Sequence, residues 1–480
     1  MRLPILIIAS LVAVSGCVSK HDPPDLAPTG VTAVGGDGVA LLTWDQLPDL
    51  TYWIFYAPGN SVSPGQVGSI AIKNAVSPRA VTGLLNDTPY AFVMNATNQD
   101  SAAGPNSQVV RANTRLAGDF WTKGSEQGTA QGLKDLNALA FNGAARYVTV
   151  GDGTTIFAGD FNYGHTDPVG VTEWFGPATT PPITWFLQGS DTSTPGGAPP
   201  AGFAPDFKAV IFNGAFVALG ATGEVATSAD GLNWVTHHAV VTAGGLGGIT
   251  GGLTGLTGIA FGVSTTSGFI YIAVGSGGQM YTTTDLTALV DWTPVTSLGT
   301  TSNLTSITFL SGFFIVTGED GTLLASVDGA NWTQQTITPP LPPGTTLRSA
   351  AYMTNAGVIA GAVSFVAVGD GGVIVSGTRD PSNITQPGIW TSTLIPGAPN
   401  LRSVAVGGAT GFRFLAVGQG GTAVFGDSVV NNVTTGVQSL VNPIQWSVAS
   451  QPQPGDLSSV HFVTGQYLAV GPAGGNAVCH

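Results

Sequence analysis

Hydrophobic and polar residues alternate over short stretches along most of the chain, and glycine or polar turn residues separate these stretches. One pattern recurs from residue 136 onward: a leucine or phenylalanine, a variable residue, a small residue and then alternating apolar positions. Such alternation is typical of a β-strand with one face buried. Seven segments of this kind begin at Leu136, Phe207, Leu256, Leu304, Leu347, Leu401 and Leu457.

Each of these segments is followed by a second apolar stretch that ends in glycine, as in VTVGDG, IVTGED and LAVGQG, and then by a third. A tryptophan closes the pattern six times, at Trp185, Trp234, Trp292, Trp332, Trp390 and Trp446. Each copy of the repeat thus contains three apolar segments and a closing tryptophan segment, which predicts one four-stranded sheet for each copy. Neighbouring copies that pack together bury a continuous core.

The seventh repeat reaches His480 without its tryptophan, whereas Asp119–Ser125, which contains Trp121, stands alone before the first repeat. In a β-propeller an N-terminal strand can complete the last blade and close the ring, which removes exposed sheet edges. We therefore predict an all-β fold with a seven-bladed propeller over residues 118–480, in which Trp121 belongs to the outer strand of the last blade.

Two hairpin turns carry nearly the same sequence. They are SADGLNW, with Ser228, Asp230, Gly231 and Trp234, and SVDGANW, with Ser326, Asp328, Gly329 and Trp332. Serine and aspartate side chains bond local backbone, and glycine accepts a positive φ. The turns resemble the Asp box of bacterial neuraminidase (BNR) repeats, and the whole region resembles the propellers of that group and of photosystem II assembly factors. The resemblance implies a β-propeller fold. It also implies that the two turns have a structural role and carry no catalytic groups.

Residues 28–115 have a different pattern. Apolar alternation in Val39–Trp44, Tyr52–Tyr56 and Ala91–Ala96 predicts strands of an antiparallel sandwich. The spacing of Leu84 and Tyr90, together with the tryptophan at position 44, resembles the fibronectin type III signature. That resemblance implies a β-sandwich that serves as a spacer or a protein-contact module.

The first residues have the pattern of an export signal: one cation, Arg2, then the apolar run Leu3–Val14 and small residues before Cys17. The residues Val14–Cys17 resemble a lipobox, which implies a signal peptide over residues 1–16, diacylglycerol on Cys17 and a linker over residues 17–27. By the same resemblance, Val18 favours the outer membrane. An ordinary secretory signal is the alternative. The other cysteine, Cys479, is expected to be a free thiol or to lie buried in a strand.

The chain is acidic, with 14 basic and 27 acidic side chains and a formal net charge of −13. Nucleic-acid binding requires a clustered basic surface, and no basic run is present, so we exclude a nucleic-acid partner. The sequence contains no motif typical of metal, cofactor or phosphate binding, and we predict neither a metal nor a cofactor.

Two sets of residues should share one end of the propeller channel. The variable residues of the first strands are Asn137, Lys208, Thr257, Thr305, Arg348, Arg402 and Ser458, and the following turns contribute Asp152, Ala221, Ser276, Glu319, Asp370, Gln419 and Pro472. The candidate binding residues are Arg348, Arg402, Lys208, Asp370, Glu319 and Asn137. Two guanidinium groups at a channel mouth can clamp a carboxylate or sulfate. Alternatively, the arginines pair with Asp370 and Glu319 and serve only to keep this end of the channel hydrated.

Three functions remain open. A recognition or scaffold protein would bind a protein, peptide or glycan through one face of the propeller. A carbohydrate-active hydrolase or lyase of sialidase-like fold would need two carboxylates about 5–10 Å apart at the channel mouth. An assembly factor is implied only by the resemblance to the photosystem II group, whose propeller carries more arginines on one face than Arg348 and Arg402 supply. We expect recognition without catalysis.

Overall fold

The computed structural model describes residues 21–99, 101–114, 117, 121–123, 135–142, 146–153, 155–160, 184–187, 206–241, 253–286, 289–296, 298–353, 363–378, 388–407, 413–427, 429–431, 438–440, 444–449, 455–463, 466–472 and 476–479. These residues form strands, turns and single-turn 3-10 segments. Within them, no helix has the length and apolar character needed to cross a membrane. The chain divides into two compact units: Met1–Thr32, Thr43–Ser77 and Tyr90–Arg111 form one, and Ala33–Leu42, Pro78–Pro89 and Ala112–His480 form the other.

The first unit is built on one antiparallel sheet of strand order β4-β3-β6-β7. Its strands are β3 (Leu50–Pro58), β4 (Ile70–Ala75), β6 (Pro89–Asn98) and β7 (Val110–Asn113). Strand β3 pairs with β6 along its whole length, and Tyr52, Ile54 and Phe92 are fully buried. The strands predicted at Tyr52–Tyr56 and Ala91–Ala96 are therefore present. A three-stranded sheet has the order β1-β2-β5, from β1 (Thr32–Gly36), β2 (Val39–Thr43) and β5 (Arg79–Thr82), and nearly all of its residues belong to the second unit.

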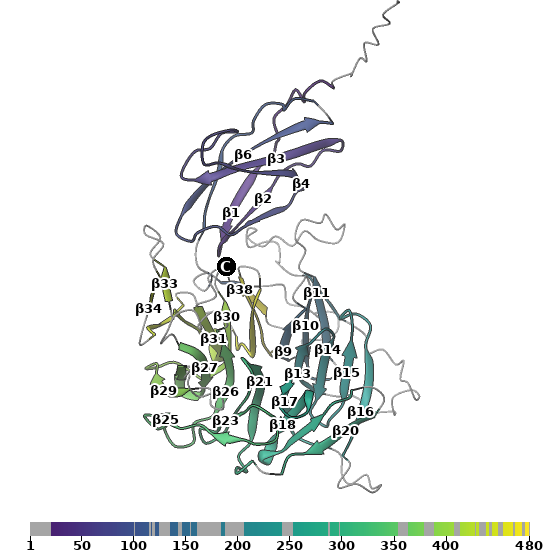
Figure 1. Ribbon diagram of the computed structural model, residues 1–480, viewed down its shortest axis with the longest axis vertical. Helices are drawn as coiled ribbons and strands as arrows, with labels where there is room; N and C mark the ends of the chain where they lie inside the picture. Colours follow the sequence, from purple (N-terminus) through teal and green to yellow (C-terminus); the bar gives the residue numbers. More distant parts are fainter. Residues whose placement is uncertain are drawn as a thin grey trace, which may run out of the picture. The chain divides into compact units, whose positions relative to one another are not determined.

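From residue 136 onward, the second unit consists of successive antiparallel sheets, and their strands pair mostly in sequence order (Figure 1). The first strand of each repeat is β9 (Leu136–Phe141), β13 (Phe207–Phe212), β17 (Leu256–Ser264), β21 (Leu304–Leu310), β26 (Leu347–Tyr352), β30 (Leu401–Gly407) or β36 (Ser459–Val463). The second strands are β10 (Arg146–Gly151), β14 (Phe216–Gly220), β18 (Gly268–Gly275), β22 (Phe313–Gly318), β27 (Val363–Gly369), β31 (Arg413–Gly418) and β37 (Gln466–Val470). The third strands are β11 (Thr155–Asp160), β15 (Val225–Ser228), β19 (Met280–Thr283), β23 (Leu323–Ser326), β28 (Val373–Thr378), β32 (Ala423–Asp427) and β38 (Asn476–Cys479). The outer strands are β12 (Thr184–Leu187), β16 (Val235–Val241), β20 (Leu289–Pro294), β24 (Thr333–Gln334), β29 (Ile389–Leu394), β35 (Trp446–Val448) and β8 (Trp121–Lys123).

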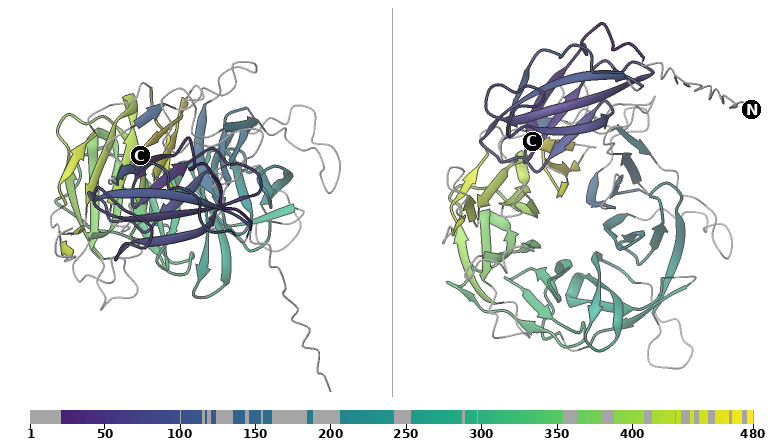
Figure 2. Two further views of the ribbon diagram at one scale, coloured as in Figure 1. Left: turned by 90° about the horizontal axis from the view of Figure 1, so that it is seen from above. Right: turned by 45° about the horizontal axis from the view of Figure 1, so that its top comes forward.

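The first strands contact one another in the order β9, β13, β17, β21, β26, β30 and β36, and β36 contacts β9 again. The sheets therefore surround a central opening, as the right-hand view of Figure 2 shows. This circular arrangement of antiparallel sheets is that of a β-propeller.

The N-terminal strand predicted around Trp121 pairs with the end of the chain. Strand β8 lies antiparallel to β38, with Trp121 opposite Cys479, Thr122 opposite Val478 and Lys123 opposite Ala477. Strand β38 in turn pairs with β37. The pairing expected from the sequence is confirmed, and Cys479 lies in a strand.

The core lies between neighbouring sheets. Val366 and Ile374 of one sheet, for example, pack in one buried cluster with Phe414 and Val424 of the next. Close approach requires glycine where an aromatic side chain crosses to the adjacent sheet: a Cβ atom on Gly407 would lie 2.2 Å from the ring of Phe462. This position therefore accepts no larger side chain unless the ring moves.

Candidate functional site

A β-bulge places one side chain in the central opening from six of the seven first strands. In β9 the partners of Gly151 and Val150 are Leu136 and Ala138, so Asn137 is left unpaired. A bulge of this kind turns the extra residue away from the regular strand direction. The same register shift leaves one residue unpaired in each of five further first strands. These residues are Lys208, Thr257, Thr305, Arg348 and Arg402. The variable position of the sequence repeat is thus a bulge.

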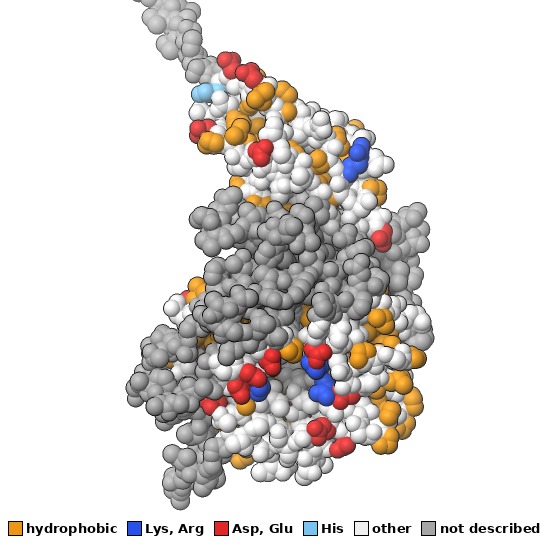
Figure 3. Space-filling model, turned by 180° about the vertical axis from the view of Figure 1, so that it is seen from behind, with side chains coloured by type: hydrophobic (Ala, Val, Ile, Leu, Met, Phe, Trp, Pro, Cys, Tyr) orange, Lys and Arg blue, Asp and Glu red, His pale blue; other side chains and the backbone are white. Residues whose placement is uncertain are grey.

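These side chains line a central cavity of about 730 Å³. Its charged wall residues are Lys208, Arg348 and Arg402, and serine and threonine residues such as Ser276, Ser306 and Ser459 lie among them. Figure 3 shows basic and acidic side chains around a hollow on one face of this unit. Both predicted arginines and the predicted lysine therefore face one cavity.

An aspartate holds each of the three cations. Lys208 Nζ lies 2.6 Å from Asp152 Oδ1, and Arg348 donates from Nε and Nη2 to the two carboxylate oxygens of Asp370, the second bond being 2.8 Å long. Burial alone would raise the pKa of Asp152, but the hydrogen bonds from Lys208 and Asn137 and the charge of Lys208 outweigh burial and lower that pKa. Asp152 therefore stays ionised at neutral pH, and each aspartate holds its cation at the cavity wall.

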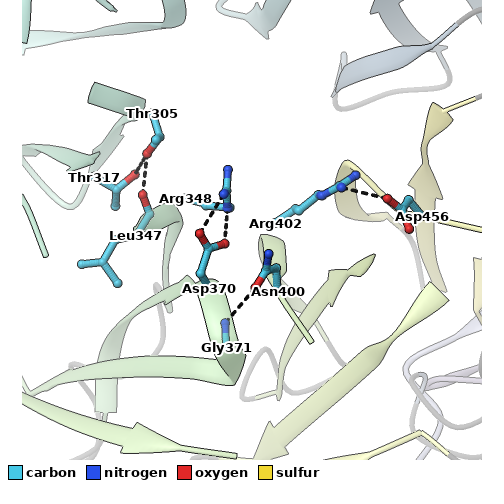
Figure 4. Close-up of polar contacts among 9 residues, drawn as sticks. All are labelled: Thr305, Thr317, Leu347, Arg348, Asp370, Gly371, Asn400, Arg402 and Asp456. Atoms are coloured by element: carbon cyan, nitrogen blue, oxygen red, sulfur yellow. Dashed lines mark hydrogen bonds and ion pairs between the residues drawn. The ribbon is translucent and has the colours of Figure 1, made fainter. Parts of the chain in front are cut away.

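Arg402 has a different partner from the one that the sequence suggested. Its Nη2 donates to Asp456 Oδ2 over 2.8 Å, while Asp370 is occupied by Arg348 (Figure 4). Glu319 accepts a bond from Asn303 Nδ2 at 2.9 Å and pairs with neither arginine in the described part of the chain. The expected pairing with Asp370 is thus present for one arginine, and the pairing with Glu319 is wrong: this carboxylate bonds Asn303 of its own sheet, and Arg402 bonds Asp456.

The uncharged bulge residues tie neighbouring sheets together. Asn137 Nδ2 donates to the carbonyl of Phe207 over 2.8 Å, and Thr257 Oγ1 donates to the carbonyl of Leu304 over 2.7 Å. Thr305 Oγ1 bonds the carbonyl of Leu347 in the same way. In each case the acceptor is the first residue of the next first strand, so these side chains stabilise the inner wall of the cavity.

A second set of residues, which the sequence analysis did not identify, joins the sheets at the same end. The residue before a first strand is often aspartate or asparagine, and its side-chain oxygen accepts a hydrogen bond from a backbone N–H in the turn of the preceding sheet. The pairs are Asp206 with Gly153, Asn303 with Gly277, Asn400 with Gly371 and Asp456 with Gly420, at 2.7–2.9 Å. We call these four bonds the inter-sheet clasps. The recurrent aspartate or asparagine before the repeat leucine was the sequence signal for them.

Asp456 takes part both in an inter-sheet clasp and in a cation pair. Its Oδ1 accepts the clasp bond from the N–H of Gly420, and its Oδ2 accepts from Arg402. Asp152 similarly joins Asn137 and Lys208, which belong to adjacent sheets. Two of the three cation–aspartate pairs, Lys208–Asp152 and Arg402–Asp456, therefore also join neighbouring sheets of the ring.

The two Asp-box-like turns have the expected local structure. Asp230 Oδ1 accepts bonds from the N–H groups of Leu232 and Asn233, and Trp234 Nε1 donates to the carbonyl of Gly231 over 3.0 Å. The bond from the Asn233 N–H is the main reason why the pKa of Asp230 is well below its usual range, although burial opposes it.

The second turn repeats these contacts. Asp328 Oδ1 accepts from the N–H groups of Ala330 and Asn331, and Trp332 Nε1 donates to the carbonyl of Gly329 over 3.1 Å. Burial would raise the pKa of Asp328, but these bonds lower it to about 2. Ser228 and Ser326 each bond the N–H of the turn glycine. The serine, aspartate and tryptophan side chains of both turns are thus bonded within the turn itself, which supports a structural role for them.

One histidine lies in the wall of the cavity. His461 belongs to β36, and burial lowers its pKa to about 4. The ring is therefore neutral at physiological pH. Among the residues that the structure describes, no cluster of histidine, cysteine and acidic side chains could hold a metal ion. Cys17 lies outside the described residues.

Comparison with known proteins adds a general likeness in fold. No family model matches the chain, and no curated protein does. Among solved structures, YCF48 from Cyanidioschyzon merolae is similar at a TM-score of 0.45 and 13% sequence identity, over 75% of this chain and 98% of that one. The WD40 β-propeller domain of Doa1 is similar at a TM-score of 0.43 and 9% identity, over 75% of this chain and 97% of that one.

Proposed function

We propose that this chain is a non-catalytic recognition or scaffold lipoprotein of the cell envelope. Its propeller has seven blades, and residues 28–115 form a fibronectin type III-like sandwich that acts as a spacer. Diacylglycerol on Cys17 anchors the protein in the outer membrane. The partner is a protein, peptide or glycan that binds the face of the propeller where the central cavity opens.

The observation that carries this proposal is the set of three cations, Lys208, Arg348 and Arg402, in the wall of one cavity. Their side chains are 31%, 36% and 31% exposed, so each has surface left for a ligand. The chain as a whole carries a formal net charge of −13. A local group of cations on such a molecule favours an anionic ligand group at this position, because complementary charge selects and orients a partner.

The surroundings of the carboxylates support binding over catalysis. A glycosidase needs one carboxylic acid that gives up its proton and a second carboxylate that acts as base or nucleophile. The pKa of Asp152 is lowered, not raised, and Asp370 and Asp456 are engaged with Arg348 and Arg402. A carboxylate whose pKa is lowered, as at Asp152, is a poor proton donor at neutral pH. The other two carboxylates hold cations in place.

The pairing of strands supports a ring of seven blades. Each of the first strands that begin at the repeat leucine or phenylalanine contacts its neighbours, and β36 returns to β9. Strand β8 supplies the outer strand of the sheet that contains β36, β37 and β38. For the sandwich, the supporting observations are the burial of Trp44, Leu84 and Tyr90, each 5% exposed.

A pull-down from envelope extracts tests the proposed function. The bait is the full chain, in wild-type form and as Arg348→Ala plus Arg402→Ala. A matched control, Arg79→Ala plus Arg111→Ala, removes two exposed cations from β5 and β7. We expect a specific envelope partner to be retained by the wild type and the control and lost by the cavity variant. A partner that all three baits retain would contradict recognition at the cavity.

The lipid anchor has its own test. Cys17→Ala removes the thiol that would carry diacylglycerol, so the variant should no longer partition into detergent and should be soluble after export or remain unprocessed. Unchanged detergent partitioning would show that the chain is held at the membrane by other means.

A further inference from the structure

The positions of the three cavity cations around the ring define two places for anionic groups. Lys208 lies on β13, whereas Arg348 and Arg402 lie on the adjacent strands β26 and β30. Between β13 and β26 are the two first strands β17 and β21, and between β30 and β13 are the two first strands β36 and β9. The lysine therefore stands across the cavity from the pair of arginines.

Each cation keeps hydrogen-bond donors for a ligand. Arg402 makes one bond within the described residues, from Nη2 to Asp456, and a guanidinium has five N–H groups. Lys208 Nζ bonds only Asp152 there, and an ammonium has three donors. Arg348 is held at both Nε and Nη2 by Asp370, which leaves mainly Nη1. Arg402 is thus the cation best able to bind a carboxylate, and Arg348 adds charge beside it.

The uncharged wall between the cations favours ligand hydroxyl groups. Thr257 and Thr305 use their own hydroxyl protons to bond the carbonyls of Leu304 and Leu347. Thr305 Oγ1 also lies 3.1 Å from Thr317 Oγ1, from which it accepts. A hydroxyl oxygen has two lone pairs, so each threonine can still accept from a ligand, and such a wall suits a ligand that donates O–H groups. The cavity volume of about 730 Å³ lies within the usual range for sites that enclose small organic ligands, about 300–1,000 Å³.

We infer that the cavity binds an acidic oligosaccharide whose carboxylates lie at both ends of the bound segment, one at Arg402 and Arg348 and the other at Lys208, while its hydroxyl groups bond the threonine wall. The inference rests on the proposed function and names the ligand class for the same face. It also assigns the two ends different roles, because Arg402 can form two parallel bonds to a carboxylate and the lysine acts as a single point charge.

Calorimetric titration of the full chain with galacturonic acid and its dimer, trimer and tetramer tests this inference. If both ends are engaged, affinity should rise by at least about tenfold between the monomer and the shortest oligomer that reaches both cation sites, because the second contact becomes intramolecular. Methyl-esterified oligomers of the same length should bind at least about tenfold more weakly. A glutamate tripeptide, which lacks the hydroxyl groups, should also bind more weakly than the uronate trimer.

Three variants locate the binding. Arg402→Gln and Lys208→Gln should each reduce oligomer affinity by at least about tenfold, and Lys208→Gln should also remove the dependence of affinity on oligomer length. Arg111→Gln, at an exposed position of β7, should change neither the oligomer affinity nor its dependence on oligomer length. Circular dichroism and melting curves check that every variant is folded.

Any one of four results would overturn the inference. The affinity could be the same for all oligomer lengths, or the same for the methyl esters as for the free acids. The glutamate tripeptide could bind as tightly as the uronate trimer or more tightly, or no oligouronate could bind at all. The pull-down separates this failure from failure of the proposed function. If the double arginine variant still loses an envelope partner while oligouronates do not bind, recognition at the cavity stands and the ligand class is wrong.

Discussion

Asn400 Oδ1 accepts a hydrogen bond of 2.9 Å from the backbone N–H of Gly371, which belongs to the turn between β27 and β28 of the neighbouring sheet (Figure 4). Gly371 has a φ of +65°, a conformation that glycine adopts without strain. The contact therefore combines a glycine with positive φ at one end and an aspartate or asparagine oxygen at the other, and three further clasps repeat it around the ring.

Loss of a clasp should weaken the contact between two sheets. We expect Asn400→Ala to lower the free energy of unfolding by about 0.5–1.5 kcal/mol, the usual net contribution of one hydrogen bond. Asn400→Asp should retain most of the stability, since aspartate fills the equivalent place at Asp206 and Asp456. Urea denaturation of the full chain measures both. Equal stability of the alanine variant and the wild type would mean that water replaces the bond without cost.

Removal of the closing strand should have a larger effect. Deletion of residues 119–125 exposes the edge of β38 to solvent and opens the ring. The expected loss is on the order of 2–4 kcal/mol, because each lost ladder hydrogen bond contributes about 0.5–1.5 kcal/mol. Deletion of residues 191–197 is the control, because their sequence, DTSTPGG, lacks the apolar alternation of a strand. If both deletions melt like the parent, closure of the ring through Trp121 is wrong.

The Asp-box-like turn at Asp328 should make stability depend on acid pH. Its pKa is lowered from 3.8 to about 2 in the folded chain, so its contribution is complete above about pH 4 and is lost as pH falls from 3.8 to 2. Asp328→Ala should cost about 2–4 kcal/mol at pH 7, since charged hydrogen bonds contribute about 1.5–3 kcal/mol each. The difference from wild type should shrink at pH 3. A difference that stays constant from pH 7 to pH 2 would contradict the assignment.

His461 should add a second acid-sensitive contribution at higher pH. Burial lowers its pKa from 6.5 to about 4, so the unfolded chain binds a proton first, and the folded state loses stability as pH falls from 6.5 to 4. His461→Gln should therefore be less sensitive than the wild type to acidification from pH 7.5 to 4.5, measured by urea denaturation. His21→Gln, at an exposed site, controls for loss of a histidine. Parallel curves for wild type and His461→Gln would show that the pKa of this ring is the same in the folded and the unfolded chain, which would contradict the prediction.

The strands and their order could be predicted because alternation and turn chemistry are local properties of the sequence. The segment beginning at Leu304 predicted a strand, and β21 spans Leu304–Leu310. The pairing of Trp121 with the chain end was predictable from counting, since one repeat lacked a tryptophan and one tryptophan lacked a repeat. Repetition supplied long-range information that a single strand does not contain.

The partners of the arginines could not be predicted in the same way. Arg402 reaches Asp456 of the next sheet, and Arg348 bonds Asp370 of its own sheet, although both occupy the same position of the repeat. The choice depends on which acid stands within reach after the bulge has turned each side chain, and the sequence pattern does not show the bulge. The close approach at Gly407 was hidden for the same reason, because it arises between sheets.

Hydrogen–deuterium exchange of the full chain, with and without its captured envelope partner, tests recognition at the cavity most directly. We predict that the partner slows exchange at the starts of β13, β26 and β30, where Lys208, Arg348 and Arg402 stand, and leaves the outer strands β16 and β29 unchanged. Protection confined to the outer strands or to the first unit, with no change at the three cation positions, would contradict the account.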